Sequence, residues 1–192
     1  MFYSFVRVVL WIICRFTWRF TVTGLENIPK EGAFLLCGNH IHLFDAPVMA
    51  VFSPRRLAFM AKKELFRRGW LAFLFRAVGA FPVDRAAAAD MEAYRNALKA
   101  LNNGMGVLIF SQGTRMKEFE NAKSGVAMFA LKSGAPIVPV GISGSYRFFS
   151  RVTVRIGTPI SMEKYAGRKV KSDVLAEVMN EVIPAVTALT VP

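Results

Sequence analysis

Histidine and cysteine are scarce in this chain of 192 residues, which has two of each. The cysteines, Cys14 and Cys37, form no C-x-x-C pair, so neither a disulfide framework nor a thiolate metal site is indicated, and a reducing compartment fits. Acidic residues are also few: 13 stand against 25 lysines and arginines, for a formal net charge of +12. This excess of positive charge favours a polyanionic partner, either nucleic acid or an anionic membrane surface.

The apolar content decides between these two partners. Hydrophobic residues make up 54% of the chain, and 17 of them are phenylalanine. A nucleic-acid binder needs a basic face but not this apolar load, whereas a protein that lies on anionic lipid needs both. We therefore predict an anionic membrane surface as partner and no nucleic acid, for a chain long enough for one domain with its own core.

A hydrophobic run long enough to span a bilayer is missing from the N-terminus. The run from Val8 to Cys14 is far shorter than the roughly 20 residues that a span needs. Arg7, Arg15 and Arg19 fall within about 120° on a helical wheel. We predict an amphipathic helix over residues 1–18 that lies on the membrane with its arginines directed at lipid phosphates. A helix packed on the domain and a short re-entrant insertion are the alternatives; a secretory signal is disfavoured because no small-x-small cleavage site follows.

A second apolar stretch runs from Trp70 to Phe75, between the basic residues Arg67, Arg68 and Arg76. Basic side chains around an aromatic segment are typical of a lipid-facing surface. The alternative is that the leucines and Phe75 belong to the core and the charges to a solvated face. The sequence alone favours neither.

Strands alternate with helices over residues 19–192, which we predict to be one α/β domain. The expected strands cover 19–23, 33–37, 57–61, 79–83, 106–110, 136–142 and 152–156; the expected helices cover 45–52, 63–78, 87–101 and 124–132, with a last one from about 172 that Pro184 kinks or ends. This order predicts a mixed, largely parallel sheet flanked by helices. Ligands of such folds gather beyond the carboxyl ends of the strands.

Both histidines, His40 and His42, lie between an expected strand and an expected helix. A neutral imidazole accepts a proton from a hydroxyl at physiological pH, and does so best when a carboxylate accepts its other N–H. Asp45, across a tight turn from His40, is placed to be that carboxylate. The alternatives are that Asp45 only caps the following helix, or that His40, His42 and Asp45 bind a metal ion; no further histidine supports the metal site.

No internal nucleophile accompanies this pair, because residues 141–145 lack the last glycine of the G-x-S-x-G elbow. The attacking hydroxyl is therefore expected to belong to a substrate. Residues 110–115 follow an expected buried strand and contain Gly113, Thr114 and Arg115. A glycine loop, a hydroxyl and a guanidinium are suited to binding phosphate, although a plain glycine turn with a solvated arginine has the same composition.

Four blocks in fixed order resemble the glycerolipid acyltransferases, the PlsC-like 1-acylglycerol-3-phosphate (lysophosphatidate) acyltransferase family. The N-H-x4-D block matches Asn39, His40 and Asp45. Three further blocks resemble the family's Gly-x-hydrophobic-x-x-Asp-Arg strand end, its F-P-E-G-T-R-S segment and its hydrophobic-Pro-hydrophobic strand, at residues 79–85, 110–116 and 137–140; residues 61–65 resemble its A-K-x-E-L element. Together they cover most of the chain.

The resemblance implies that His40 is the base and Asp45 its orienting carboxylate. The base would deprotonate the free hydroxyl of lysophosphatidate, which attacks the thioester of acyl-CoA or acyl-carrier protein and forms phosphatidate. The resemblance also implies an acceptor phosphate site made of Lys62, Arg85, Gln112, Gly113, Thr114 and Arg115. No metal and no bound cofactor are implied, and the enzyme is expected at the cytoplasmic face of a membrane, the bacterial inner membrane, as a peripheral or monotopic protein.

Three residues of the third block depart from the family pattern. Gln112 replaces a glutamate, Ser111 a proline and Met116 a serine. The glutamate is the residue that positions the acceptor, so another lysophospholipid or glycerol-3-phosphate is an alternative acceptor. Two rival functions remain: a hydrolase in which His40 activates water, and a non-catalytic protein that binds membranes or nucleic acid through its charge.

Overall fold

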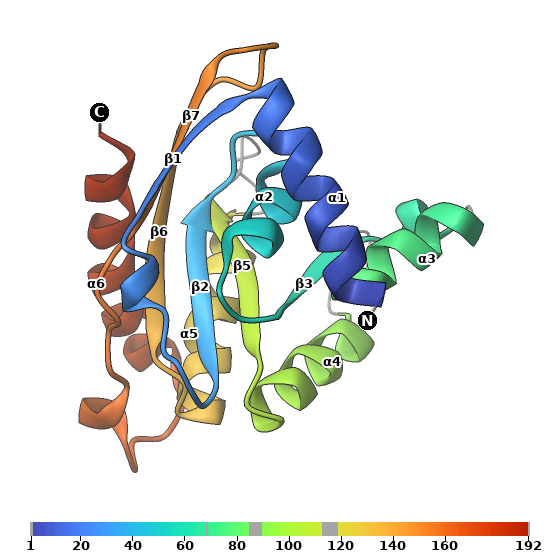
Figure 1. Ribbon diagram of the computed structural model, residues 1–192. Helices are drawn as coiled ribbons and strands as arrows, with labels where there is room; N and C mark the ends of the chain where they lie inside the picture. Colours follow the sequence, from blue (N-terminus) through green and yellow to red (C-terminus); the bar gives the residue numbers. More distant parts are fainter. Residues whose placement is uncertain (1, 68, 85–89, 113–118, 192) are drawn as a thin grey trace.

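The computed structural model describes residues 2–67, 69–84, 90–112 and 119–191. These residues form one seven-stranded sheet with helices on both faces (Figure 1), in the order β1-β7-β6-β2-β5-β3-β4. All neighbouring strands are parallel except β6 and β7, so the expected mixed, largely parallel sheet is confirmed. The strands are β1 (Arg19–Thr23), β2 (Phe34–Asn39), β3 (Leu57–Lys62), β4 (Ala80–Val83), β5 (Gly106–Gln112), β6 (Ile137–Gly144) and β7 (Arg151–Ile156).

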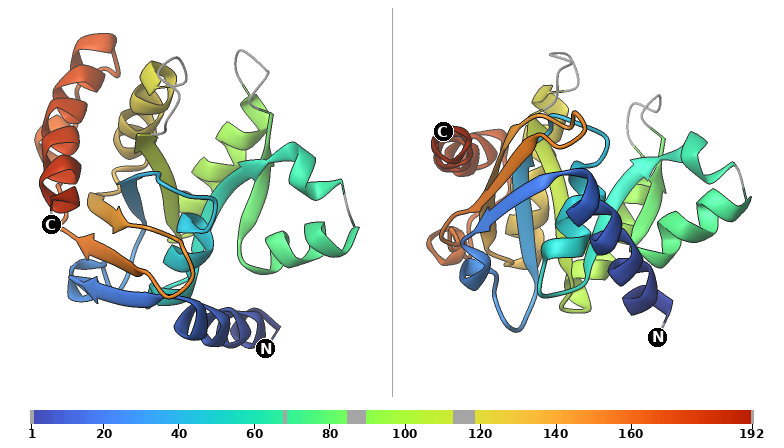
Figure 2. Two further views of the ribbon diagram at one scale, coloured as in Figure 1. Left: turned by 90° about the horizontal axis from the view of Figure 1, so that it is seen from above. Right: turned by 45° about the horizontal axis from the view of Figure 1, so that its top comes forward.

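The helices divide between the two faces of the sheet (Figures 1 and 2). Phe34 and Leu36 of β2 belong to a core shared with α1 and α2, whereas Leu35 and Cys37 belong to a core shared with α4, α5 and α6. All six residues of β2 are consequently buried, which explains its continuous apolar sequence. The α-helices are α1 (Phe2–Thr17), α2 (Asp45–Phe52), α3 (Gly69–Ala77), α4 (Met91–Asn102), α5 (Phe119–Ser133) and α6 (Ser172–Thr190).

Two helices differ from the sequence prediction in their bounds, and Pro184 does not have one of its two expected effects. The single helix expected over 63–78 is a 3-10 turn (Lys63–Phe66) followed by α3, which starts at Gly69; glycine is a poor residue for a helix interior. The helix expected from Ser124 starts earlier, at Phe119. Pro184 does not end α6, which continues to Thr190. Pro184 lies on the exposed face of the helix, where the carbonyl that loses its amide donor is open to water.

Helix α1 has one side buried in the core and one side that exposes apolar side chains. Val6 and Cys14 are buried in the core against α2 and β1, whereas the opposite side exposes seven large apolar side chains: Phe5, Val8, Val9, Trp11, Ile12, Ile13 and Phe16. The helix therefore packs on the domain and also presents an apolar surface. The three arginines do not share one helical face, because α1 ends at Thr17 and Arg19 belongs to β1.

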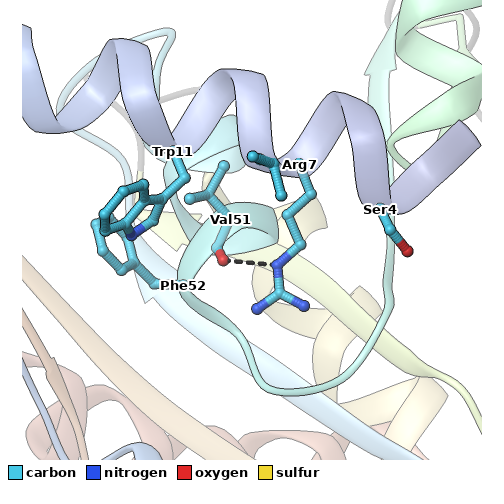
Figure 3. A pocket seen from close by; sticks show the side chains of 6 residues that line it. Ser4, Arg7, Trp11, Val51 and Phe52 are labelled. Atoms are coloured by element: carbon cyan, nitrogen blue, oxygen red, sulfur yellow. Dashed lines mark hydrogen bonds between the residues drawn. The ribbon is translucent and has the colours of Figure 1, made fainter.

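Arg7 turns inward, contrary to the expectation that it faces lipid phosphates (Figure 3). Its Nε donates to the carbonyl of Val51 at 2.8 Å and its Nη2 to that of Ser53 at 2.7 Å. These carbonyls lie at the C-terminal end of α2, which has unpaired acceptors and a partial negative charge. Beside this contact lies an open cavity of about 410 Å³, lined by Ser4, Arg7, Val8, Trp11, Val51 and Phe52.

The second apolar stretch is divided in the same way as α1. Trp70 and Phe73 are 69% and 59% exposed, whereas Leu74 and Phe75 pack against the core. The core interpretation thus holds for Leu74 and Phe75, whereas Trp70 and Phe73 are exposed and their contact with lipid stays a prediction. Within the described ranges, no helix has the length and apolar character needed to cross a membrane.

Asp90 caps α4, which begins later than residue 87; residues 87–89 lie outside the described ranges. Its Oδ1 accepts from the amides of Glu92 and Ala93, and its Oδ2 from that of Asp84 at 2.6 Å. The hydrogen bonds from Ala93 and then Asp84 hold the pKa of Asp90 below its ordinary value. The cap therefore favours the ionised carboxylate.

We expect Asp90→Ala to lower the free energy of unfolding by about 1–2 kcal/mol at neutral pH. Because the pKa of Asp90 is lowered in the folded state, the difference between wild type and variant is present above the unfolded pKa of about 4. It is lost as the pH falls through the lowered folded value. Urea unfolding at several pH values measures this. Asp173→Ala, which removes an acidic residue from the first turn of α6 where no side chain caps, is the matched control.

Candidate active site

Three of the segments that the sequence singled out lie at the carboxyl ends of three neighbouring strands, β2, β5 and β3 (Figure 1). Asn39 is the last residue of β2 and pairs with Gln112, the last residue of β5. Lys62 is the last residue of β3, the next strand in the sheet. Parallel strands bring their carboxyl ends to one edge, so blocks far apart in sequence become neighbours at the loop of His40.

Asn39 joins β2 to β6 through its side chain. The backbone pairing of these strands extends to Gly38 and Val140. Beyond it, Asn39 Nδ2 donates to the carbonyl of Ile142, and the amide of Ile142 donates to Asn39 Oδ1, both at 2.7 Å. The buried amide side chain thus replaces a strand residue at the point where β2 ends and the loop begins.

His40 and Asp45 form the pair that their spacing predicted. His40 Nδ1 lies 2.8 Å from Asp45 Oδ2. The same oxygen accepts from the amides of Ile41 at 2.7 Å and His42 at 2.8 Å. Asp45 makes no side-chain cap of α2, whose N-cap is Phe44. The capping alternative is therefore wrong: the carboxylate binds the loop that precedes the helix.

This geometry assigns the proton on the imidazole of His40. Because Asp45 Oδ2 accepts from two amides, it also acts as acceptor towards His40, and Nδ1 carries the hydrogen. Nε2 is then the nitrogen with a free lone pair. The ring stacks on Phe110 of β5 at 4.4 Å between centroids, and the side chain stays 31% exposed. An oriented imidazole with an accessible Nε2 is suited to accept a proton from a substrate hydroxyl.

His42 lies in an aromatic cluster instead. Its ring stacks on Tyr146 at 4.7 Å and on Phe44 at 5.3 Å, and its Nδ1 accepts a long hydrogen bond of 3.4 Å from the amide of Phe44. Among the described residues, no three histidine, cysteine or acidic side chains are arranged to hold a metal ion.

Tyr146 is a residue of this site that the sequence analysis did not find. It follows β6, far from His40 in sequence, and packs on His42 and on Trp18, whose ring lies 5.4 Å away. Burial, reinforced by the negative charge of Asp45, raises the pKa of Tyr146 far above its ordinary value. Only the pairing of β6 with β2 brings it here, so no local pattern marks it.

The phosphate-binding residues are placed only in part. Lys62 is exposed at the end of β3, and the backbone of Gln112 lies beside Asn39. The side chain of Gln112 and the whole of Arg85, Gly113, Thr114 and Arg115 lie outside the described residues. Residues 141–144, which failed the nucleophile-elbow pattern, belong to β6 and form no strand-to-helix turn.

Comparison with known proteins gives a consistent result. Residues 19–143 match the Acyltransferase family. A 1-acyl-sn-glycerol-3-phosphate acyltransferase of Bacillus subtilis is 30% identical over 170 residues, which cover 85% of each chain. The enzyme of that name from Borreliella burgdorferi is 30% identical over 75% of this chain and 58% of its own length. The crystal structure of the 1-acyl-sn-glycerophosphate acyltransferase PlsC from Thermotoga maritima superposes with a TM-score of 0.69 at 26% identity, covering all of this chain and 79% of that one.

We expect Asn39→Leu to lower the free energy of unfolding by about 2–4 kcal/mol, because it leaves the buried amide and carbonyl of Ile142 without partners. Denaturant unfolding measures this. Asn27→Leu removes one half-buried hydrogen bond, to the carbonyl of Ile156, and serves as the control with a smaller loss. Equal losses in the two variants would show that the link between β2 and β6 has no special weight.

Proposed function

Because this chain belongs to the Acyltransferase family, we propose that it transfers a fatty acyl group to the free hydroxyl of 1-acyl-sn-glycerol-3-phosphate and so forms phosphatidate. The observation that carries this proposal is the contact of 2.8 Å between His40 and Asp45 at the carboxyl end of β2. The names of the curated relatives support the acceptor. The acyl donor is a thioester, either acyl-CoA or acyl-carrier protein.

The proposed reaction uses the free nitrogen of His40. Nε2 takes the proton from the acceptor hydroxyl as its oxygen attacks the thioester carbonyl carbon. The tetrahedral intermediate collapses and the C–S bond breaks. The sulfur receives the proton from the imidazolium of His40 and leaves as the thiol of the donor. Asp45 keeps Nδ1–H directed at its carboxylate throughout and stabilises the imidazolium. No covalent acyl-enzyme and no cofactor are needed.

The acceptor phosphate is proposed to lie at the same edge of the sheet. Lys62, at the end of β3, supplies one positive charge there. Arg85 and Arg115 are proposed to supply the others, with Gln112, Gly113 and Thr114 adding hydrogen-bond donors. A guanidinium binds phosphate through two parallel hydrogen bonds, and the excess of 25 basic over 13 acidic residues favours an anionic acceptor.

We further propose that the enzyme works as a peripheral protein on the cytoplasmic face of a membrane. The exposed apolar side of α1 and the exposed Trp70 and Phe73 of α3 support this location. The net charge of +12 complements an anionic lipid surface. An acceptor held in such a surface presents its hydroxyl and phosphate at the height of the headgroups.

The activity test is transfer of a labelled acyl group to detergent-dispersed lysophosphatidate, from acyl-CoA and acyl-carrier protein in parallel. We expect His40→Ala to reduce the rate at least about 10³-fold and Asp45→Asn about 10²–10⁴-fold, because each removes the oriented base. His42→Phe keeps the aromatic stacking and is the matched control, with a change of only a few-fold.

Other outcomes distinguish the rival functions. Fatty acid released by wild type without any acceptor would identify a hydrolase. Transfer only to another lysophospholipid or to glycerol-3-phosphate would correct the acceptor. Gln112→Glu tests the departure in the third block: activity that appears only in this variant would assign the acceptor change to Gln112. No transfer from either donor to any acceptor would refute the proposed function.

A further inference from the structure

The connection between β6 and β7, residues 145–150, exposes two adjacent aromatic rings. Phe148 and Phe149 are 71% and 60% exposed, and their rings make an edge contact with centroids 4.3 Å apart. Together with the half-buried Tyr146 they give this short turn three aromatic residues. Adjacent exposed phenylalanines on a short turn are a feature of interaction surfaces.

The backbone of this turn is held in an unfavourable conformation. Phe149 has φ +59° and is the one non-glycine residue with a positive φ in the described part of the chain. Such strain persists only where the surroundings enforce it, and it concentrates at functional segments. Here the amide of Phe149 donates to the carbonyl of Thr17 at 2.8 Å, and the amide of Arg19 donates to that of Ser150 at 2.9 Å. The turn is thereby fastened to the end of α1, where Phe16 is 74% exposed (Figure 1).

Positive charges surround this apolar group. Arg147 and Arg151 flank the two phenylalanines, and Arg15 and Arg19 flank the end of α1; all four are exposed. Residues 145–151 contain no acidic residue. Exposed aromatic rings that are flanked in the sequence by exposed arginines match the boundary between headgroups and acyl chains of an anionic bilayer.

The same turn adjoins the loop of His40. Tyr146 packs on His42 and on Trp18, and Trp18 contacts Phe44 at 5.1 Å between centroids. Phe44 is 41% exposed and its neighbour Leu43 is 64% exposed. The exposed apolar side chains of the turn, of the end of α1 and of the catalytic loop therefore form one neighbourhood, which we name the docking surface: Phe16, Leu43, Phe44, Phe148 and Phe149.

We propose that the docking surface binds an anionic phospholipid bilayer, with Phe148 and Phe149 inserted below the phosphates and Arg147 and Arg151 bound to them. The proposal rests on the proposed function, because a lipid acceptor is the reason to expect a phospholipid bilayer on this surface. It adds a contact separate from the exposed apolar sides of α1 and α3, and one that directs the loop of His40 towards the lipid. An acceptor would then reach His40 without leaving the bilayer.

The test is sedimentation with vesicles of phosphatidylglycerol and phosphatidylcholine. Phe148→Ser combined with Phe149→Asn removes both rings, and asparagine tolerates the positive φ. We expect vesicle binding to weaken by roughly tenfold or more, and transfer to vesicle-embedded acceptor to fall in parallel, while transfer to detergent-dispersed acceptor stays unchanged. Met91→Ser combined with Val170→Ser removes exposed apolar side chains elsewhere and is the matched control. Arg147→Gln combined with Arg151→Gln should reduce the salt dependence of binding.

Vesicle binding as tight as wild type in the phenylalanine variant would overturn the docking surface. A wild type that elutes as a dimer from a sizing column, with the phenylalanine variant eluting as a monomer, would also overturn it, because the surface would then be a protein interface. Failure of the proposed function can be told apart from failure of the docking surface. In that case wild type would bind vesicles through these residues but would transfer no acyl group, even in detergent.

A second observation concerns two buried polar atoms beside His40. Asp45 Oδ1 and the hydroxyl of Tyr146 are both buried, and neither has a hydrogen-bond partner among the described residues. Asp45 is fully buried and uses only Oδ2 for its three donors. Asp45 Oδ2 accepts from the amide of His42 at 2.8 Å, and the ring of His42 stacks on Tyr146 at 4.7 Å between centroids. The carboxylate and the phenol are thus neighbours across one residue, and the charge of Asp45 adds to the burial that raises the pKa of Tyr146. A buried acceptor and a buried donor that each lack a partner both lower the stability of the fold. A hydrogen bond between them would remove both losses.

We infer that Tyr146 is a positioning residue: its hydroxyl donates to Asp45 Oδ1, directly or through one water, and fixes the carboxylate that orients His40. This inference also rests on the proposed function for the role of His40. Besides His40 and Asp45, the titratable groups described around Tyr146 are His42 of the same loop and Cys14 of α1.

Tyr146→Phe keeps the ring and removes the donor. With one donor fewer, the carboxylate accepts the Nδ1–H of His40 more strongly, so the Nδ1–H signal of His40 should move downfield. Because the chain has only two histidines, NMR of the substrate-free protein resolves this signal, with His42→Phe for assignment. We also expect kcat to fall several-fold while KM changes little.

Tyr3→Phe is the matched control, since the hydroxyl of Tyr3 is also buried without a partner among the described residues but belongs to the first turn of α1. A Tyr146→Phe variant with altered stability but with the His40 Nδ1–H signal of wild type would overturn the inference. The NMR measurement needs no turnover, so it decides the role of Tyr146 even if acyl transfer is not found.

Discussion

One oxygen atom of Asp45 accepts hydrogen bonds from His40 Nδ1 and from the amides of Ile41 and His42. This shared acceptor folds the loop after β2 into a tight turn and assigns the tautomer of the imidazole at the same time. The carboxylate is fully buried, so water does not compete for these bonds. The side chain that holds the loop is therefore also the one that orients the imidazole of His40, the proposed base.

The sheet supplies the setting for that loop. Burial on both faces leaves β2 and β5 no exposed side chains along much of their length, so polar residues gather where the strands end. Asn39 closes β2 against β6 through a side chain, and the register places Gln112 next to it. The proposed catalytic pair and the proposed phosphate site thus share one edge, although no single segment joins them.

The helices on the α1 side perform two tasks with one amphipathic pattern. Val6 and Cys14 pack on the core, whereas Phe5 and Phe16 face outward. A helical wheel does not distinguish an arginine that faces lipid from one that faces the protein. Arg7 binds the C-terminal carbonyls of α2, and these acceptors become known only once α2 is placed. For the same reason the exposed rings of Phe148 and Phe149 were not foreseen, since they depend on how the turn meets α1.

Local periodicity in the sequence predicted the order of strands and helices and the largely parallel sheet, and short-range spacing predicted the pairing of His40 with Asp45. The family was predicted from the resemblance of four motif blocks in fixed order. Local propensity did not predict the start of α3 at Gly69 or the continuation of α6 past Pro184, because packing and exposure outweigh it there. The role of Arg7 and the packing of Tyr146 on His42 follow from the tertiary structure alone. These contacts join residues of distant segments, and strand order and register, which no local pattern encodes, bring such residues together.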